Sequence, residues 1–361
     1  MTTSELPIAG PREAAPVTRY LCTPREDLIT ALLGCTMMIG LQTDAWAHAN
    51  IIDTIESFFT PWHAMLYGGF TALAAWTFWL ALRRRSSTPR WWRDGWPAGY
   101  ALGALGAVGF MAGGLADLAW HTIFGIEASL EIAFSPSHLL LAFSAILLLS
   151  SPARSWWATG QGGVRAAAGV VSLALATVFA TAILTPLSAF ASTVPTRAYE
   201  EVTGSPTYTA AALGIGAYLL STVVLAVPLL LAHRRRATPG TATGIVAAVG
   251  LFPCLMYELP ADLTAAAAGA LAGAALADLA MFRLDAVRGR HALLRLPIAG
   301  ALLAALVWSG HLLGLHLAAG LRWPAELITG TVVITMVVAV TLGCLAQAPE
   351  SENRAERFTA N

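Results

Sequence analysis

Charged residues are scarce in this chain of 361 amino acids. Asp, Glu, Lys and Arg together make up 12% of the sequence, whereas 57% of the residues are hydrophobic. Soluble domains usually carry about 25% charged residues, so the composition argues against a soluble protein and predicts a lipid bilayer as the principal partner. The formal net charge is zero, which gives no electrostatic basis for binding nucleic acid.

Paired cysteines and the common catalytic motifs are also lacking. The four cysteines, Cys22, Cys35, Cys254 and Cys344, form no CxxC pair, so we expect no disulfide framework. The sequence contains no Walker loop, no Rossmann fingerprint and no Ser/His/Asp hydrolase motif. These absences leave nucleotide-dependent and serine-hydrolase activities without support.

Apolar runs of about 20 residues, each long enough to cross a bilayer as a helix, are what the chain has in abundance. They predict an all-α, polytopic transmembrane helix bundle with about ten spans in a single domain, residues 26–347. Residues 1–25 and 348–361 are rich in Pro, Ser, Thr and charge, and we expect them to be flexible cytoplasmic tails. The expected spans are approximately 28–48, 61–82, 97–122, 136–151, 166–187, 207–232, 241–258, 261–282, 297–317 and 324–346.

Arginine clusters predict the orientation of these spans. If the amino terminus is inside, every even-numbered connection is basic. The positive-inside rule then places both termini in the cytoplasm of a cell (inner) membrane protein. The arginines of these connections are Arg83, Arg84, Arg85, Arg90, Arg93, Arg154, Arg165, Arg234, Arg235, Arg236, Arg288, Arg290 and Arg295.

The first two helical hairpins repeat one pattern. The matching segments are Asp44-x-x-x-His48 with Thr60-Pro61-Trp62-His63, and Asp117-x-x-x-His121 with Ser135-Pro136-Ser137-His138. In the later hairpins the second helix still opens with a proline and a polar residue two positions on, at Tyr208, Asp262 and Glu326. We therefore predict five hairpins in parallel repeat, at about 26–85, 97–152, 166–236, 241–284 and 297–347.

Each of the first two repeats offers one aspartate and two histidines near the non-cytoplasmic ends of its helices. The aspartate and first histidine are spaced i, i+4 and share one helix face. The second histidine follows an expected N-cap and an N1 proline, where the helix dipole favours the neutral imidazole that binds a metal. The predicted metal ligands are Asp44, His48, His63, Asp117, His121 and His138.

Further polar residues are expected at the same membrane face and are candidates for additional site residues. Histidine and carboxylate inside a membrane are costly unless they are paired or functional. His311 and His316 lie about 140° apart around a helix, so they cannot both face one point. Asp262 and Glu326 also suit ordinary helix capping. The additional candidates are Tyr208, Glu258, Asp262, His311, His316 and Glu326.

The Asp-x-x-x-His motif followed by a second histidine resembles the metal site in a membrane-embedded subunit of particulate methane and ammonia monooxygenases. It is matched by Asp44, His48 and His63, and again in the second repeat. The chain is also similar to bacterial multi-span membrane proteins with Ser-Pro-x-His segments. The resemblance implies a membrane metal site, and any oxidoreductase chemistry would follow from it.

The leading hypothesis is an integral membrane protein that binds metal ions. Copper is expected first because the sites face the non-cytoplasmic side, where external copper would reach them, and iron or zinc would also suit these ligands. A secondary transporter is an alternative, with Asp44 and Asp117 relaying protons or an ion. The remaining alternatives are haem ligation by His63 and His138 and a purely structural Asp–His network.

Overall fold

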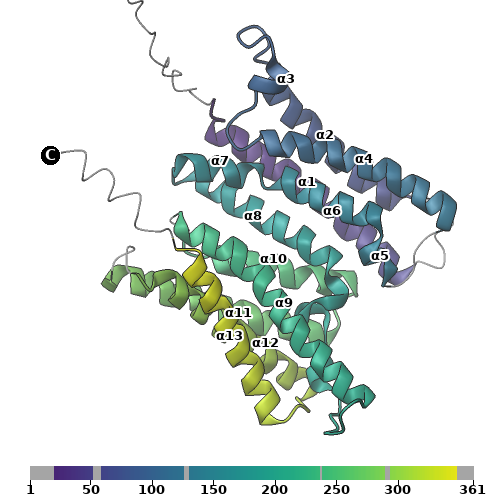
Figure 1. Cartoon of the computed structure of the whole chain (residues 1–361), viewed down its shortest axis with the longest axis vertical. Coiled ribbons are helices and arrows are strands. Elements are labelled where there is room, and N and C mark those ends of the chain that lie inside the picture. Colours follow the sequence, from purple (N-terminus) through teal and green to yellow (C-terminus); the bar gives the residue numbers. More distant parts are fainter. Residues whose placement is uncertain (1–19, 52–57, 126–129, 236–237, 289–292, 348–361) are drawn as a thin grey trace, which may run out of the picture.

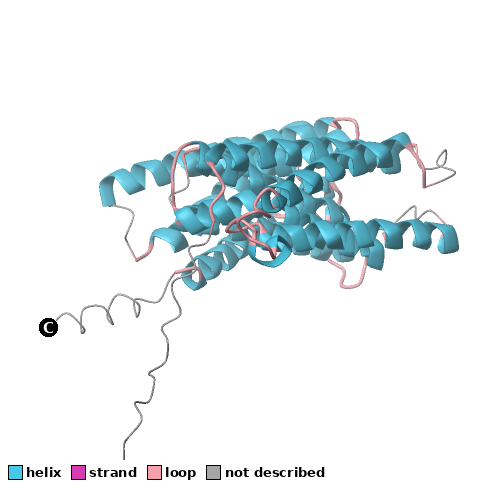
Figure 2. Ribbon diagram, turned by 90° about the horizontal axis from the view of Figure 1, so that it is seen from above, coloured by secondary structure: helices cyan, strands magenta, loops and turns pink. Residues whose placement is uncertain are grey.

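The structure is a computed structural model that describes residues 20–51, 58–125, 130–235, 238–288 and 293–347. These residues form helices joined by turns and loops, with no strand among them (Figure 2). The all-α fold class is therefore confirmed. Arg236, Arg290 and most of the expected tails, residues 1–19 and 348–361, lie outside the described residues.

Long helices joined by short turns and loops make up the chain (Figure 1). Three short 3₁₀ turns, η2 to η4, follow α8 between residues 185 and 196. The helices are α1 (Pro24–Asn50), α2 (Pro61–Leu82), α3 (Trp91–Asp94), α4 (Ala101–Phe124), α5 (Glu131–Phe134), α6 (Pro136–Leu149), α7 (Ser151–Thr159), α8 (Val164–Ile183), α9 (Pro206–Arg234), α10 (Thr241–Met256), α11 (Ala261–Arg288), α12 (Arg295–Ala319) and α13 (Ala325–Leu345).

In the described part of the chain, nine helices are long and apolar enough to cross a membrane, with Pro136–Thr159 counted as one. The remaining predicted span corresponds to α10, which is apolar but has only 16 residues. At 1.5 Å per residue it is about 24 Å long, less than the hydrocarbon core of about 30 Å. The polytopic helical bundle is thus confirmed, and α10 is its shortest candidate span.

The predicted helix starts at Pro61 and Pro136 are correct. Thr60 accepts a hydrogen bond from the backbone N–H of His63 at 3.1 Å, as an N-cap residue does. Ser135 occupies the same position before α6, but its hydroxyl lies 2.9 Å from Nδ1 of His138 instead of capping a backbone N–H. Thr60 therefore caps its helix through its side chain, whereas Ser135 contacts the histidine ring of the first turn.

The bundle has two halves that meet at α8 and α10. Figure 1 shows α1, α2, α4 and α6 on one side and α9, α11, α12 and α13 on the other. In the first half, α1 packs on α2 and α4 packs on α6, while α8 contacts both α1 and α6. Phe70 and Phe110 stack in the core of this half, with ring centroids 4.4 Å apart. The helices of the first two predicted hairpins thus pack against each other as pairs.

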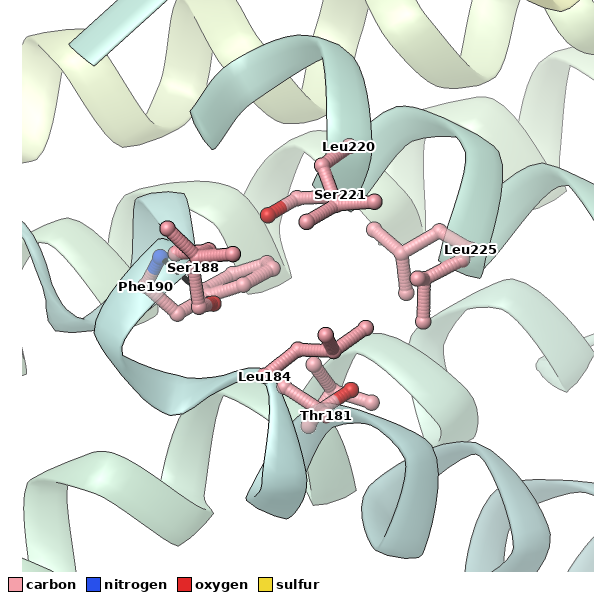
Figure 3. A pocket seen from close by; sticks show the side chains of 10 residues that line it. Thr181, Leu184, Ser188, Phe190, Leu220, Ser221 and Leu225 are labelled. Carbon is pink, nitrogen blue, oxygen red and sulfur yellow. Dashed lines mark hydrogen bonds between the residues drawn. The ribbon is translucent and has the colours of Figure 1, made fainter. Parts of the chain in front are cut away.

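The connection from α8 to α9 folds back onto the bundle through its 3₁₀ turns. Figure 3 shows Ser188 and Phe190 of this connection facing Leu220, Ser221 and Leu225 of α9. Ser221 accepts a hydrogen bond from the backbone N–H of residue 189 at 3.0 Å. Ser221 thereby satisfies a backbone donor that would otherwise be buried without a partner. This hydrogen bond joins the connection to α9.

A buried ion pair joins the helices at the basic end of the bundle. Asp27 in the first turn of α1 is fully buried, and its Oδ2 lies 3.0 Å from Nε of Arg165 in α8. Tyr100 donates to Oδ1 at 2.8 Å and Ser155 donates to Oδ2 at 2.9 Å. Residues 20–25 were expected as part of a tail, but α1 already begins at Pro24, and Cys22 is buried at 2% exposed.

Candidate metal centre

The first Asp–His–His set forms where α1 ends and α2 begins. Asp44 and His48 lie on the last turns of α1, and His63 lies in the first turn of α2. Oδ1 of Asp44 is 3.5 Å from Nε2 of His63. One ligand atom from each residue lies within 4.8 Å of the other two. The fold therefore brings these three residues, which the sequence predicted as ligands, close together.

The second set repeats this geometry at the junction of α4 and α6. Oδ1 of Asp117 lies 3.5 Å from Nε2 of His121 and 3.2 Å from Nε2 of His138. The two imidazole rings are 5.8 Å apart and tilted by 57°. The histidine rings of the first set are 5.9 Å apart with the same tilt of 57°. The repeat in sequence is thus a repeat in space.

Backbone carbonyls orient the histidines that begin α2 and α6. Nδ1 of His63 lies 2.6 Å from the carbonyl oxygen of Phe58, and Nδ1 of His138 lies 2.7 Å from that of Ile132. A carbonyl oxygen only accepts, so Nδ1 carries the proton that it donates. Nε2 of each neutral ring then has a lone pair directed at the carboxylate, as in histidines that ligate metals.

His121 and Asp117 carry buried polar atoms that face each other. Its Nδ1 lies 3.1 Å from the carbonyl oxygen of Gly125, so its Nε2 lone pair faces Oδ1 of Asp117. Among the described residues, neither Nε2 of His121 nor Oδ1 of Asp117 has a hydrogen-bond partner, and both atoms are buried. Two lone pairs facing each other in a buried site repel, and a cation between them satisfies both.

The charges of the two sets also favour a bound cation. Asp117 is 2% exposed, and His63 and His121 are each 7% exposed. Within the described residues, the ion-pair partners of Asp44 and Asp117 are histidines alone. A buried carboxylate needs a compensating positive charge. A metal ion would supply it.

One aromatic ring contacts both sets. The ring of Phe58 stacks on His63 at 4.7 Å between centroids and lies 6.1 Å from the ring of His121. Tyr67, one turn further along α2 than His63, is 6.1 Å from Phe58. The sequence assigns Phe58 only to an aromatic belt at the membrane interface, and it gives Tyr67 no role, because the spacing of Tyr67 is that of an ordinary packing residue.

Both sets line one cavity of about 460 Å³. The carboxylates and imidazoles in its lining are those of Asp44, His48, His63, Asp117 and His138. Its other walls come from α8 and α10 as well as from the two hairpins, and they include Tyr67, Phe110, Phe179, Phe252 and Met256. The fold therefore presents both candidate metal sites to the same cavity.

The additional carboxylate candidates lie outside the two sets. Glu258 accepts a hydrogen bond at 3.3 Å from Nε1 of Trp46, so it approaches the first set without joining its ligand group. Asp262 accepts from the backbone N–H of Leu263 at 2.8 Å, and Glu326 is exposed in the first turn of α13. None of these carboxylates belongs to a ligand group within the described residues.

The remaining candidates are also separate from the sets. His311 is fully buried in the second half of the bundle, where its Nδ1 lies 3.0 Å from the hydroxyl of Tyr218. His316 is exposed, and its Nδ1 accepts from the backbone N–H of Leu321 at 3.4 Å. Tyr208 is exposed near the start of α9. Only the six residues of the two repeats form the groups that can hold a metal ion within the described chain.

Comparisons with known proteins return no match among family models, curated proteins or solved structures.

Proposed function

We propose that this chain is an integral membrane metalloprotein that binds two transition-metal ions, copper foremost, one in each Asp–His–His set. The observation that carries the proposal is the buried pair of Oδ1 of Asp117 and Nε2 of His121. These atoms face each other at 3.5 Å without a hydrogen-bond partner in the described chain. The near-identical ring geometry of the first set supports the same assignment there.

The donor atoms favour a late first-row metal. Two imidazole nitrogens and one carboxylate oxygen suit copper, zinc and iron, and Cu²⁺ binds such ligands most tightly in the Irving–Williams order. Three protein ligands also leave a coordination position open for a further molecule. Copper is therefore the first expectation, and elemental analysis distinguishes it from zinc and iron.

The distribution of arginine supports a non-cytoplasmic location for the metal sets. Arginines gather at the end of the bundle opposite to His63, where Arg83 follows α2, Arg154 lies in α7, Arg234 ends α9 and Arg295 begins α12. By the positive-inside rule, that basic end faces the cytoplasm of the cell membrane. The metal sets would then take up ions from the external side.

The alternatives use the same residues in other ways. Nε2 of His63 points at Asp44 and Nε2 of His138 points at Asp117, which favours two small-ion sites over one haem shared by these histidines. A haem protein would show a Soret band after purification. A proton-coupled transporter would instead show substrate flux into proteoliposomes that Asp44→Asn abolishes.

Elemental analysis of the detergent-purified protein by plasma mass spectrometry tests the proposal. We expect about two equivalents of metal in the wild type, one for each ligand group. The double variants His48→Ala/His63→Ala and His121→Ala/His138→Ala should each lose about one equivalent, and the quadruple variant should lose both. His316→Ala, which removes an exposed histidine outside both sets, is the control. No metal in reconstituted wild type, or full metal in a folded quadruple variant, refutes the proposal.

A further inference from the structure

The cavity beside the two sets is larger than two metal ions require. Its volume is about 460 Å³, whereas a water molecule takes about 30 Å³ and an apolar cavity of about 150 Å³ already accommodates benzene. Pockets for small organic ligands begin at about 300 Å³. The space therefore suits an organic molecule in addition to the metal ions and their water.

The part of the cavity wall that lies outside the metal-binding hairpins is apolar. It is formed by α8 and α10, which contribute Phe179, Ile183, Phe252 and Met256. Phe179 and Phe252 are 5% and 3% exposed, so their rings are held in packed positions. No charged side chain is among the α8 and α10 residues that line the cavity in the described chain. This wall suits a hydrocarbon or aromatic surface and disfavours a charged one.

The ionisable ligand groups of the cavity belong to the metal sets. Asp44 and His63 from one set, and Asp117 and His138 from the other, line the same space. Because three protein ligands leave a metal with an open position, a molecule in the cavity can reach that position only with an atom that has a lone pair. The rest of the molecule must lie against the apolar wall.

We infer that the cavity binds a small, largely apolar molecule that carries one metal-coordinating nitrogen, oxygen or sulfur atom. The donor atom meets a metal held by an Asp–His–His set, and the apolar body lies against α8 and α10. This inference rests on the proposed function for its metal and adds the chemical class of the ligand.

A pair of probes tests the ligand class. Imidazole and 4-phenylimidazole have the same donor nitrogen, and only the second has an apolar body. We expect 4-phenylimidazole to bind the copper-loaded wild type at least about tenfold more tightly, because its ring is buried against the apolar wall. Electron paramagnetic resonance of the bound Cu²⁺ reports binding of each probe. Equal dissociation constants for the two probes overturn the inference.

A variant that fills the cavity sharpens the test. Ala182→Phe in α8 adds a ring to the cavity lining without altering a metal ligand, and it should remove the preference for 4-phenylimidazole while imidazole still binds. Ala167→Phe, at an exposed position of the same helix, should keep the preference. An unchanged preference in Ala182→Phe overturns the inference. The wild-type comparison decides the matter alone if that variant does not fold.

The two proposals fail in distinguishable ways. Metal content is measured before any probe is added, so a protein that holds no metal refutes the proposed function. A protein that holds about two equivalents of copper but does not discriminate between the probes refutes only the ligand class.

Discussion

Replacement of Asp117 by asparagine is the most informative single change in this protein. Asp117 is 2% exposed, and its Oδ1 faces Nε2 of both His121 and His138, at 3.5 and 3.2 Å. Asparagine keeps the shape of the side chain but removes its negative charge. The second set would then offer a metal dication no anionic ligand, whereas Asp44 and the first set would be unaltered.

The expected loss follows from the role of the carboxylate. Even partners one step removed from the metal change affinity by about 10- to 100-fold, so loss of the sole anionic ligand should weaken the second site by at least about 100-fold. At a metal concentration of about 100 times the wild-type dissociation constant, occupancy of this site falls from about 99% to about 50%. The stabilisation that metal binding at this site contributes falls from about 2.7 to about 0.4 kcal/mol.

Equilibrium dialysis with elemental analysis measures the occupancy, and thermal unfolding with and without metal measures the stabilisation. Glu326→Gln is the matched control, because it removes an exposed carboxylate at the same end of the bundle. The reasoning is refuted if Asp117→Asn binds as much metal as the control and gains as much stability from it. Asp117 would then belong to a structural network.

Two further predictions concern packing outside the metal sets. A Cβ atom at Gly269 of α11 would lie 2.0 Å from the carbonyl oxygen of Gly310 in α12, so Gly269→Ala should lower the free energy of unfolding by about 1–3 kcal/mol. Gly244→Ala, which meets no atom within 4 Å, is its control in thermal unfolding, and equal stability of the two variants would contradict the packing argument. Arg165→Ala should cost about 3–5 kcal/mol by leaving the buried charge of Asp27 unpaired, and a denaturation profile equal to that of Arg165→Ala/Asp27→Asn would contradict this.

Local chemistry explains which parts of the site the sequence predicted. Proline after Thr60 or Ser135 begins a helix through side-chain and backbone preferences of neighbouring residues, and the i, i+4 spacing of Asp117 and His121 places both on one face in any α-helix. The connecting loop then brings the second histidine of a hairpin to the end of the first helix. No long-range information is needed for these steps.

The cavity and the number of full-length membrane spans could not be predicted from the sequence, because they depend on contacts between residues far apart in the chain. Phe179 and Phe252 are far from the metal sets in sequence, and only the packing of α8 and α10 against α1 brings them to the cavity. His311 has the helical position of a site residue, yet the neighbours of α12 turn it toward Tyr218. Likewise, α10 is shorter than the expected span 241–258, because the helix ends at Met256.

The backbone partners of the histidines have an evolutionary consequence. His63 and His138 are turned toward their carboxylates by the carbonyl oxygens of Phe58 and Ile132, and a carbonyl is present whichever amino acid occupies the position. Side chains in these connections can therefore change over evolutionary time while the rings keep their direction. An insertion or deletion between Phe58 and His63 would move the carbonyl itself, so the length of this segment should be more constrained than its composition.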